Sequence, residues 1–544
     1  MTLTLSPSRA AVSAPLYDVI VVGCGPVGAV AACLLGSFGL STLIVDRSDT
    51  VYDKPRALAL DHEIARVLQG IGLGEAIKPH VAPFTPAEYF GVDGQLIKRL
   101  DMLPPPYPLG WTPSMVFMQP VVEELLRQRI AALPSVTAAF GLELIGLSNN
   151  TDCIVAQLRD ASGAEQGVRG RYLVGCDGAS STVRTLAGIT LDDLGFDQSW
   201  LVVDVLANDG GLARLPKVTV HYCEPERPTS FLIGTGRHRR WEFKLRPDED
   251  PRVMEAPEQV WSLLRNWIEP SQAELWRSAS YRFHALVAHD WRRGRVFVAG
   301  DAAHQQPPFL GQGLCQGIRD VANLTWKLAH VLQGRSGTTL LDTYGIERAS
   351  HVRRLHSVII GIGEIIGEGD GDAARARDAR LIAEAGGTVR SVPRQNLQPA
   401  LDSGCIGSKP CDGRGTLFPQ PTVRRNQGDV LLDDLTGAGG RVVLDRGFPQ
   451  ISATLRRRLI ALDLTVVRLA DDADVTTDVD MKSIMILEAD KVLETWFRTN
   501  GCAAALVRPD HYDFATAGHE ADLSEILDEY AQALASIGDS PHFH

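Results

Sequence analysis

The sequence lacks the cysteine and histidine spacings that bind metals or form redox-active pairs. Its nine cysteines are an odd, scattered number without a CxxC pair, and its 14 histidines include no HExxH motif. These gaps exclude a zinc knuckle and a dithiol redox centre, and no metal is expected. Most of the cysteines are expected to be small buried residues in a reducing cytoplasm.

The sequence also lacks an excess of basic residues. Lys and Arg number 54 against 66 Asp and Glu, which gives a net charge of −12, and the densest basic clusters, at 237–240 and 456–458, are short. Nucleic acid is therefore not an expected partner, because phosphate binding needs a basic patch or stripe. With 22% charged and 44% hydrophobic residues, the 544 residues are typical of a globular chain of about three or four domains.

Charge is absent from one long stretch, the 27 residues of Val19–Val45, which is enough to cross a membrane. The order within it argues against a spanning helix. Strand-forming Val19–Val22 precedes glycines, then Ala and Leu, and finally strand-forming Thr42–Val45. That order is typical of a buried strand, helix and parallel strand, so no membrane contact is expected. Residues 1–15 lack the apolar region of a secretory signal and are expected to form a disordered tail.

A glycine motif opens the helix of this unit. Gly23, Gly25 and Gly28 form GxGxxG directly after the strand, with Pro26 inside the motif. The first glycine allows a tight turn, the second lets the backbone approach a pyrophosphate, and the third lets the helix pack closely on the sheet. Asp46 ends the next strand, where a carboxylate binds ribose hydroxyls. The pattern favours a site for FAD or NAD over a glycine turn without a ligand.

Two later apolar strands also end in acidic residues. One leads into Asp177-Gly178 and the other into Gly300-Asp301. Together with Asp46, three carboxylates are expected at the carboxyl edge of one parallel sheet, where open α/β sheets bind ligands. Each acid alone is equally well explained as a turn residue or a helix cap, whereas the three together favour a nucleotide site.

Loop residues beside these strands are candidates for the same ligand. Arg47 follows the second strand directly, and Arg56 lies on a loop before an amphipathic helix, where an arginine can bind a diphosphate. Gln119 and Pro120 begin another amphipathic helix, and Pro120 suits its first turn. Taken alone, Arg56 is better explained as a surface arginine.

The three strand ends and these loops together resemble the single-component, FAD-dependent aromatic hydroxylases, the class A flavoprotein monooxygenases. The resemblance implies that the glycine motif holds the ADP part of FAD, that the Asp-Gly motif serves FAD and NAD(P)H, and that the Gly-Asp motif holds the ribityl and pyrophosphate. The residues implied in cofactor binding are Gly23, Gly25, Pro26, Gly28, Asp46, Arg47, Arg56, Gln119, Asp177, Gly178, Arg184, Gly300, Asp301, Gly311, Gly313 and Leu314.

Several strings resemble one branch of that family, the 3-(3-hydroxyphenyl)propionate/3-hydroxycinnamate hydroxylases. They are Pro55–Ala57, Asp61–Glu63, Phe117–Pro120, Arg239–Phe243, Gly311–Gly313, Arg319–Asp320, Asn323–Leu328 and Leu506–Asp510. Cys315 departs from the pattern, because relatives place Asn there beside the flavin. The branch implies a phenolic substrate of this kind, and a heteroaromatic or polyketide-type phenol is the alternative.

The resemblance implies that NADH or NADPH reduces FAD, that O₂ then forms a flavin C4a-hydroperoxide, and that a phenolic ring takes up the distal oxygen. A residue that accepts the phenol proton is expected. The candidates are His304 after the Gly-Asp strand, Tyr222 and Arg240 on the expected substrate sheet beside His221, and Pro307 at the flavin edge. Packing or capping explains His304 and Tyr222 at least as well, and shaping of the loop explains Pro307.

The expected fold is α/β, with a Rossmann-like FAD-binding domain at 16–195 and 286–366 and an inserted β-sheet substrate domain at 196–285. Residues 367–421, rich in Gly, Pro and charge, are expected to be a linker or irregular connection. Residues 422–544 resemble the thioredoxin-like C-terminal domain of phenol hydroxylase relatives. Because this region lacks CxxC, it is expected to serve structure or oligomerisation, and a homodimer is left open.

Two other function classes are weaker alternatives. A flavin oxidoreductase without oxygen transfer is disfavoured in its disulfide form, because no CxxxxC pair lies in the first helix region. A flavin-binding interaction protein without catalysis is disfavoured, because the motifs at all three strand ends are intact.

Overall fold

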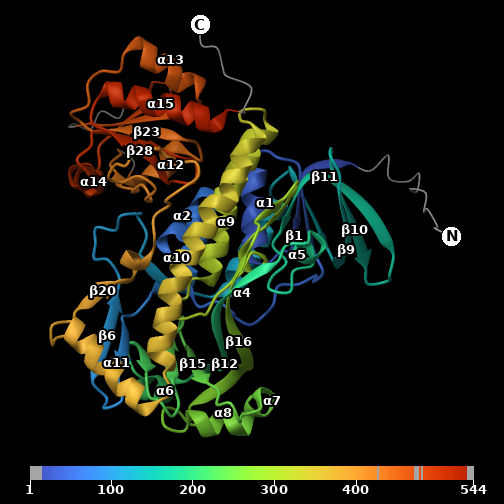
Figure 1. The fold of residues 1–544 in the computed structure, drawn as a ribbon, viewed down its shortest axis with the longest axis vertical. Coiled ribbons are helices and arrows are strands. Elements are labelled where there is room, and N and C mark those ends of the chain that lie inside the picture. The colour runs from blue at the N-terminus through green and yellow to red at the C-terminus, as the bar shows by residue number, and fades with distance from the viewer. Residues whose placement is uncertain (1–14, 426–427, 471–476, 479–481, 536–544) are drawn as a thin grey trace.

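The computed structural model describes residues 15–425, 428–470, 477–478 and 482–535, so the tail predicted for 1–15 lies outside the described residues except for its last residue. Two large sheets and a C-terminal body make up the described chain. In Figure 1 the C-terminal body, orange to red, lies at one end of the molecule and the green strands β12, β15 and β16 of the second sheet at the other, with the long helix α10 (Asp342–Gly367) running between them.

The first sheet has eight strands in the order β17-β18-β11-β1-β2-β8, with β9 and β10 extending it from β11. They are β1 (Leu16–Val22), β2 (Thr42–Asp46), β8 (Val136–Phe140), β9 (Leu142–Asn149), β10 (Ile154–Asp160), β11 (Glu165–Gly175), β17 (Arg292–Arg293) and β18 (Val296–Val298). β1 pairs in parallel with β2 and β11, and β11 pairs in parallel with β18. The carboxyl ends therefore meet at one edge, which places Asp46, Asp177 and Asp301 there as predicted.

Helices cover this sheet and bury the charge-free stretch. α1 (Pro26–Ser37) packs against α4 (Gln119–Ala131) and α9 (Gly313–Leu332). Val19–Val21 and Ala29–Ala32 are at most 1% exposed. The predicted strand-helix-strand unit is confirmed, and burial on both faces of the sheet explains why it carries no charge. Among the described helices, none combines the length and apolar character needed to traverse a membrane.

The second sheet has nine strands in the order β19-β16-β12-β15-β14-β13-β5-β6-β20. They are β5 (Ala87–Phe90), β6 (Leu96–Asp101), β12 (Leu191–Ala207), β13 (Thr219–Tyr222), β14 (Thr229–Ile233), β15 (His238–Lys244), β16 (Ala273–Ala288), β19 (His304–Gln305) and β20 (Ser391–Pro393). The predicted range 196–285 is therefore too narrow for this sheet. β5, β6 and β20 lie far away in the chain and join it by pairing, β5 in parallel with β13 and β20 in parallel with β6.

One face of the second sheet is closed by short helices, α6 (Asp209–Arg214), α7 (Pro251–Met254) and α8 (Pro257–Leu264). Val260 and Leu264 of α8 form a buried cluster with Phe231 and Trp241 of the sheet. Because side chains alternate along a strand, the residues next to Phe231 and Trp241 face the other way, toward the first sheet.

The region predicted as a linker, 367–421, contains regular structure, so that prediction is wrong in part. α11 (Gly371–Glu384) begins where the Asp370 side chain accepts hydrogen bonds from the backbone N–H groups of Asp372 and Ala373, and β20 and the 3₁₀ turn Arg394–Leu397 follow. A side-chain cap of this kind stabilises a helix start. The sequence did not reveal this helix, because the Gly, Pro and charge content of the region as a whole is typical of a linker.

The C-terminal body is a six-stranded sheet in the order β25-β26-β24-β23-β27-β28. Its elements are α12 (Leu432–Thr436), β23 (Arg441–Leu444), α13 (Ala453–Ala461), β24 (Thr465–Leu469), β25 (Thr477–Asp478), β26 (Ser483–Ile486), α14 (Val492–Asn500), β27 (Ala504–Val507), β28 (Asp513–Ala517) and α15 (Glu520–Leu534). β23 pairs in parallel with β24 and antiparallel with β27, which pairs antiparallel with β28.

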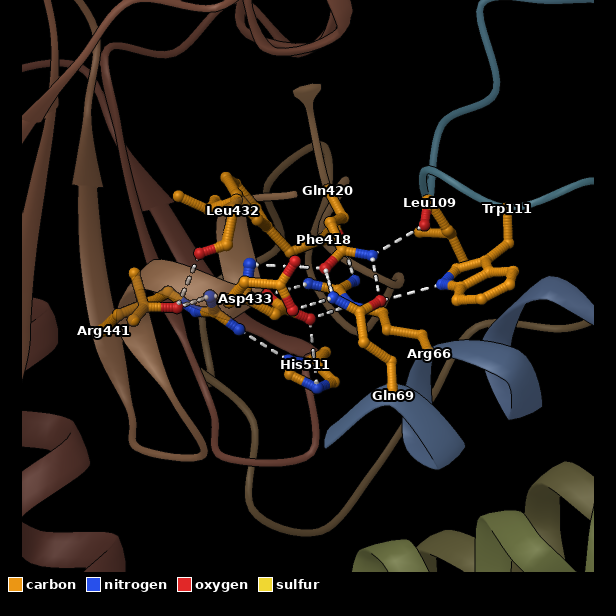
Figure 2. Close-up of polar contacts among 12 residues, drawn as sticks. Arg66, Gln69, Leu109, Trp111, Phe418, Gln420, Leu432, Asp433, Arg441 and His511 are labelled. Carbon is orange, nitrogen blue, oxygen red and sulfur yellow. Dashed lines mark hydrogen bonds and ion pairs between the residues drawn. The ribbon is translucent and has the colours of Figure 1, made fainter. Parts of the chain in front are cut away.

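Shorter elements complete the described chain. They are β3 (Ala59–Asp61), α2 (His62–Gly70), α3 (Gly74–Ile77), β4 (Val81–Pro83), β7 (Ser114–Phe117), α5 (Thr182–Leu186), β21 (Thr422–Val423), β22 (Val430–Leu431) and 3₁₀ turns at Lys78–His80, Gly300–Ala302 and Thr338–Leu341. α2 carries one of the buried polar contacts to the C-terminal body: Arg66 is buried and pairs with Asp433 at 2.6 Å (Figure 2).

Candidate active site

The glycine motif forms a backbone cradle at the carboxyl edge of the first sheet. Gly23 has a φ of +98°, and a Cβ there would lie 2.5 Å from the carbonyl oxygen of Cys176. At Gly28 a Cβ would lie 1.9 Å from the carbonyl oxygen of Gly23, whereas no atom lies within 4 Å of one at Gly25. The tight turn at Gly23, the close helix contact at Gly28 and the open space at Gly25 are the backbone geometry that such a motif needs, and their part in binding a cofactor stays a prediction.

Asp46 joins the end of β2 to this cradle. One carboxylate oxygen accepts the backbone N–H of Cys24 at 2.6 Å, and the other accepts that of Ser48 at 2.8 Å. A cavity of about 460 Å³ lies beside it. Predicted cofactor residues that line this cavity are Gly23, Gly25, Asp46, Arg47, Arg56, Asp177 and Gly178. A helix N-terminus, a glycine that leaves space for phosphate and a strand-end acid together fit an adenine dinucleotide.

A second cavity, of about 530 Å³, continues from the first. The two share Gly25, Arg56, Cys176, Gly178 and Tyr281. Predicted cofactor residues that line this cavity, besides shared ones, are Pro26, Gln119, Gly300, Asp301, Gly311, Gly313 and Leu314. Its size is typical of a ligand pocket. We name it the ring cavity, and the 460 Å³ space the dinucleotide cavity.

Gln119 shapes the loop where the two cavities meet. Its side-chain oxygen accepts the backbone N–H groups of Arg56 at 2.9 Å and Ala57 at 2.6 Å. Two hydrogen bonds to successive amides fix the loop, so Gln119 acts on the site by holding Arg56 at the junction.

Two predicted cofactor residues do not line either cavity. Gly28 packs under the cradle, as described above. Arg184 donates to the carbonyl oxygens of Ala302 at 3.1 Å and Ala179 at 2.8 Å. It therefore links two loops at the edge of the sheet. Of the residues in this contact, Ala179 lines the ring cavity.

Three of the four predicted catalytic residues lie outside the ring cavity, which corrects their assignment. His304 is buried, with Nε2 2.8 Å from a carboxylate oxygen of Asp320 and its ring stacked on Trp291. Tyr222 packs against Trp267 on the covered face of the sheet. Pro307 does not line the cavity, although the adjacent Pro308 does.

Arg240 lines the ring cavity, but its guanidinium is already bound. It contacts both carboxylate oxygens of buried Asp204, at 2.7 and 3.1 Å, and donates to the carbonyl oxygens of Pro55 at 2.9 Å and Arg56 at 2.8 Å. These contacts hold the Pro55–Arg56 loop against the second sheet. Arg240 is therefore a positioning residue in this geometry, which corrects its predicted catalytic role.

A polar row crosses the second sheet, and of its members only His221 was singled out on that sheet from the sequence. The strand register aligns Tyr89 with His221, His221 with Ser230, and Ser230 with Glu242. His221 Nδ1 lies 2.8 Å from Ser230 Oγ, and its ring stacks on Tyr89. Tyr89, His221 and Glu242 all line the ring cavity. The sequence does carry a signal for Glu242. It lies two residues after Arg240 along β15, and residues two apart on a strand point to the same face.

Two titratable members of this row, His221 and Glu242, have shifted pKa values that bear on the site. Burial lowers the pKa of His221 to about 3, with Arg394 adding to the effect, so the imidazole is neutral at pH 7. Burial raises the pKa of Glu242 to about 7, although Arg240 opposes the shift. In the described chain the Glu242 carboxyl group has no hydrogen-bond partner and lies at the cavity wall. A carboxyl group that titrates near neutral pH is typical of catalytic acids and bases.

Cys315, predicted beside the flavin, lies in the first turn of α9. It is fully buried, its sulfur is 4.0 Å from the carbonyl oxygen of Ala59, and it does not line the ring cavity. Burial raises the pKa of its thiol well above the ordinary value. The described residues hold no cluster of three or more His, Cys, Asp or Glu side chains arranged for a metal ion.

Comparisons with known proteins point in one direction. A family model described as "FAD binding domain" matches residues 16–358, and one described as "HcaD C-terminal domain" matches 415–533. The chain is 33% identical over 537 residues to the probable NADH-specific resorcinol 4-hydroxylase of Rhodococcus jostii (strain RHA1), covering 96% of each chain. It is 35% identical over 517 residues to the 3-(3-hydroxy-phenyl)propionate/3-hydroxycinnamic acid hydroxylase of Mycobacterium sp. (strain JLS), covering 91% of this chain and 88% of that one.

Two solved structures share the fold over nearly the whole chain. The flavin-dependent monooxygenase PieE, in complex with FAD and substrate, superposes with a TM-score of 0.77 at 21% identity and covers 96% of this chain and 99% of its own. Aklavinone-11 hydroxylase, with FAD and aklavinone, gives a TM-score of 0.76 at 22% identity and covers 95% and 99%.

The fold and the two joined cavities define the class of FAD-dependent monooxygenases. Within that class, this chain belongs to the family of the FAD binding domain model and is an FAD-dependent aromatic hydroxylase. The resemblance seen in the sequence is thereby confirmed.

Proposed function

We propose that the protein hydroxylates the ring of a phenol that carries a second substituent in the meta position, with NADH as electron donor. The observation that carries this proposal is the ring cavity. Its wall includes the aromatic residues Phe84, Tyr89, Tyr281, Phe283 and Phe309. An aromatic wall that continues from a dinucleotide cavity suits a flat ring placed against a flavin.

The names of the two curated relatives support the finer parts of this proposal. Resorcinol and 3-(3-hydroxyphenyl)propionate are both phenols with a second group meta to the hydroxyl. The name of the resorcinol hydroxylase specifies NADH. A polyketide-type phenol is the weaker alternative, because the structures with large polyketide ligands share only the fold.

In this proposal, bound FAD supplies the oxygen-transfer chemistry, and the protein binds, orients and desolvates the reactants. The dinucleotide cavity takes the ADP part, held by the glycine cradle, Asp46 and Asp177. Gly300, Asp301 and the turn Gly311–Gly313 take the remainder, beside the N-terminus of α9. That N-terminus favours negative charge on the group next to it.

Glu242 is the proposed acceptor of the phenol proton. Its carboxyl group faces the ring cavity without a protein hydrogen-bond partner among the described residues, and it is half ionised near pH 7. Removing the proton makes the ring more electron-rich at its ortho and para carbons, which are the positions that attack an electrophilic oxygen. Neutral His221 and Tyr89 complete the polar wall beside it.

The C-terminal body is proposed to be a thioredoxin-like domain with a structural role, supported by its order of parallel and antiparallel strands. All nine cysteines are free thiols, which supports a cytoplasmic location. A homodimer stays a prediction.

The test is a screen of the purified, FAD-loaded protein with NADH, NADPH and a panel of phenols. We expect yellow protein, faster NADH oxidation with a meta-substituted phenol, and a product heavier by one oxygen, with little H₂O₂. Stimulated NADH oxidation that yields only H₂O₂ with every phenol would contradict the proposal, because stimulation alone shows an uncoupled oxidase.

A further inference from the structure

Four arginines line the ring cavity, and only two of them are paired with a carboxylate in the described chain. Arg240 is bound to Asp204, and Arg282 is bound to Asp197. Arg56 and Arg394 have no carboxylate oxygen within 4.0 Å among the described residues. Arg56 stands at the junction with the dinucleotide cavity, where a cofactor diphosphate accounts for it. Arg394 lines the ring cavity but not the dinucleotide cavity.

Arg394 is held in place on two sides. It lies in the 3₁₀ turn Arg394–Leu397, within the range 367–421 that the sequence predicts as a linker, and its guanidinium stacks on Phe84 at 4.3 Å from the ring centroid. One terminal nitrogen donates to the carbonyl oxygen of Leu310 at 2.8 Å. A guanidinium has five N–H donors. The stacking and the single carbonyl fix its plane and leave other donors without an acceptor among the described residues.

Asp61 is the one ordinarily ionised carboxylate whose charge acts on Arg394 among the described residues, and it is already paired with Arg319. His221 is neutral at pH 7, and Tyr89 keeps its proton because burial raises its pKa above the ordinary value. Burial lowers the pKa of Arg394 itself, which means that this wall disfavours an isolated cation. A guanidinium stays protonated at neutral pH, so the site gains most from an anion that arrives with the ligand.

We propose that Arg394 binds a carboxylate group of the substrate, so that the substrate class is a phenol with a carboxylate side chain. This inference rests on the proposed phenol hydroxylation and deepens it. A carboxylate matches the planar donor fork of arginine in a bidentate way, whereas an uncharged phenol such as resorcinol leaves this partly buried cation without a partner in the cavity. Glu242 on β15 and Arg394 on its turn then contact opposite chemical ends of one substrate: the hydroxyl and the carboxylate.

The experiment uses a pair of ligands that differ only in charge, 3-(3-hydroxyphenyl)propionate and its primary amide. For the FAD-loaded wild type and for Arg394→Gln and Arg394→Lys, Kd is measured by titrating the flavin absorbance, and KM and kcat are measured by product formation. We expect Arg394→Gln to raise Kd and KM for the acid by on the order of 100-fold and to change the values for the amide by less than about threefold. Arg394→Lys, which keeps the charge but not the fork, should fall between.

A matched control is Arg282→Gln. Arg282 also lines the ring cavity, but it is exposed and already paired with Asp197. This variant should leave the ratio of acid to amide affinity unchanged. An equal loss for acid and amide in Arg394→Gln would overturn the inference, because Arg394 would then only hold the Leu310 loop. A wild type that binds the amide as tightly as the acid would also overturn it.

The two proposals fail in different ways. If the acid binds tightly and Arg394→Gln weakens it, but no oxygenated product forms, the carboxylate site stands and the proposed hydroxylation fails. If products form from uncharged phenols at the same kcat/KM as from the acid, hydroxylation stands and the carboxylate site fails.

Discussion

Among single residues, Glu242 is expected to set the pH dependence of catalysis. Because burial raises its pKa to about 7, it is protonated in mild acid and cannot accept the phenol proton there. We expect kcat/KM to rise with pH up to about 7 and then level off. Glu242→Gln should lower kcat/KM at pH 8 by about 10²- to 10³-fold and abolish this step. The control is Glu88→Gln on β5, whose side chain pairs with Arg99 on the face away from Tyr89, and which should keep the step.

The same shift is testable through stability. The folded protein keeps the Glu242 proton up to about pH 7, whereas the unfolded chain loses it near the ordinary value of 4.5. The folded state therefore binds more protons between these values, and the free energy of unfolding should fall as pH rises across this window. Glu242→Gln should remove this decrease in urea unfolding curves. A variant whose stability still falls in parallel with the wild type would show that Glu242 does not titrate there.

The sequence indicates the backbone geometry of single residues where the constraint is local. Gly23 and Gly25 were predicted because a tight turn and a phosphate approach each need the absence of a Cβ. Tyr222 failed because the residue before it, His221, faces the cavity, and a shift of one residue along a strand reverses the face. His304 failed because its partner, Asp320, lies on a different element, and Arg394 was overlooked inside a supposed linker.

At the scale of secondary-structure elements, Asp320 joins three of them. From α9 it accepts the backbone N–H of Gly300 at 2.9 Å, contacts Nε2 of His304 at 2.8 Å, and accepts from Nε of Arg348 on α10 at 2.8 Å. Although burial opposes it, His304 and Arg348 hold the pKa of Asp320 below its ordinary value. Asp320→Ala leaves a buried guanidinium unpaired and should lower the free energy of unfolding by about 3–5 kcal/mol.

Urea unfolding of the FAD-loaded protein measures this loss, and FAD affinity should weaken with it because Gly300 lines the ring cavity. Asp342→Ala is the control: its ion pair with Arg292 is exposed on the aspartate side and should contribute less than about 1 kcal/mol. Similar losses for the two variants would contradict the proposed role of the Asp320 contacts.

Elements were predictable where their own sequence pattern decides them. β1, α1 and β2 follow from one apolar run with glycines at its turns. The extent of the second sheet was not predictable, because β5, β6 and β20 join it through pairing with strands far away in sequence. Strand pairing of this kind depends on the folded chain and leaves no local periodicity.

At the scale of the whole molecule, buried charges join the C-terminal body to the catalytic part. Arg66 of α2 contacts both carboxylate oxygens of Asp433, which also pairs with Arg441 at 2.8 Å inside the C-terminal body (Figure 2). A second contact joins Tyr512 to Glu63 at 3.0 Å. α2 thus begins beside the loops that line the ring cavity, and its side chains contact the C-terminal body.

Asp433→Ala should therefore destabilise the joint between the two parts. It leaves the buried guanidinium groups of Arg66 and Arg441 without their carboxylate, and the free energy of unfolding should fall by about 3–5 kcal/mol. Asp434→Ala is a matched control, because this neighbouring carboxylate accepts from Gln69 at the exposed edge of the same interface and should cost less than about 1 kcal/mol. Chemical unfolding curves measure both.

The double variant Arg66→Ala/Asp433→Ala separates loss of the pair from loss of a single group. If the contact in Figure 2 is the joint, the double variant should be less unstable than the sum of its two single variants, because it leaves only Arg441 uncompensated. Limited proteolysis should then cut Asp433→Ala between the catalytic part and the C-terminal body before either is degraded. Strict additivity, with no selective cleavage, would mean that apolar packing and the other polar contacts, Tyr512–Glu63 and Arg508–Glu347, hold the body in place without this cluster.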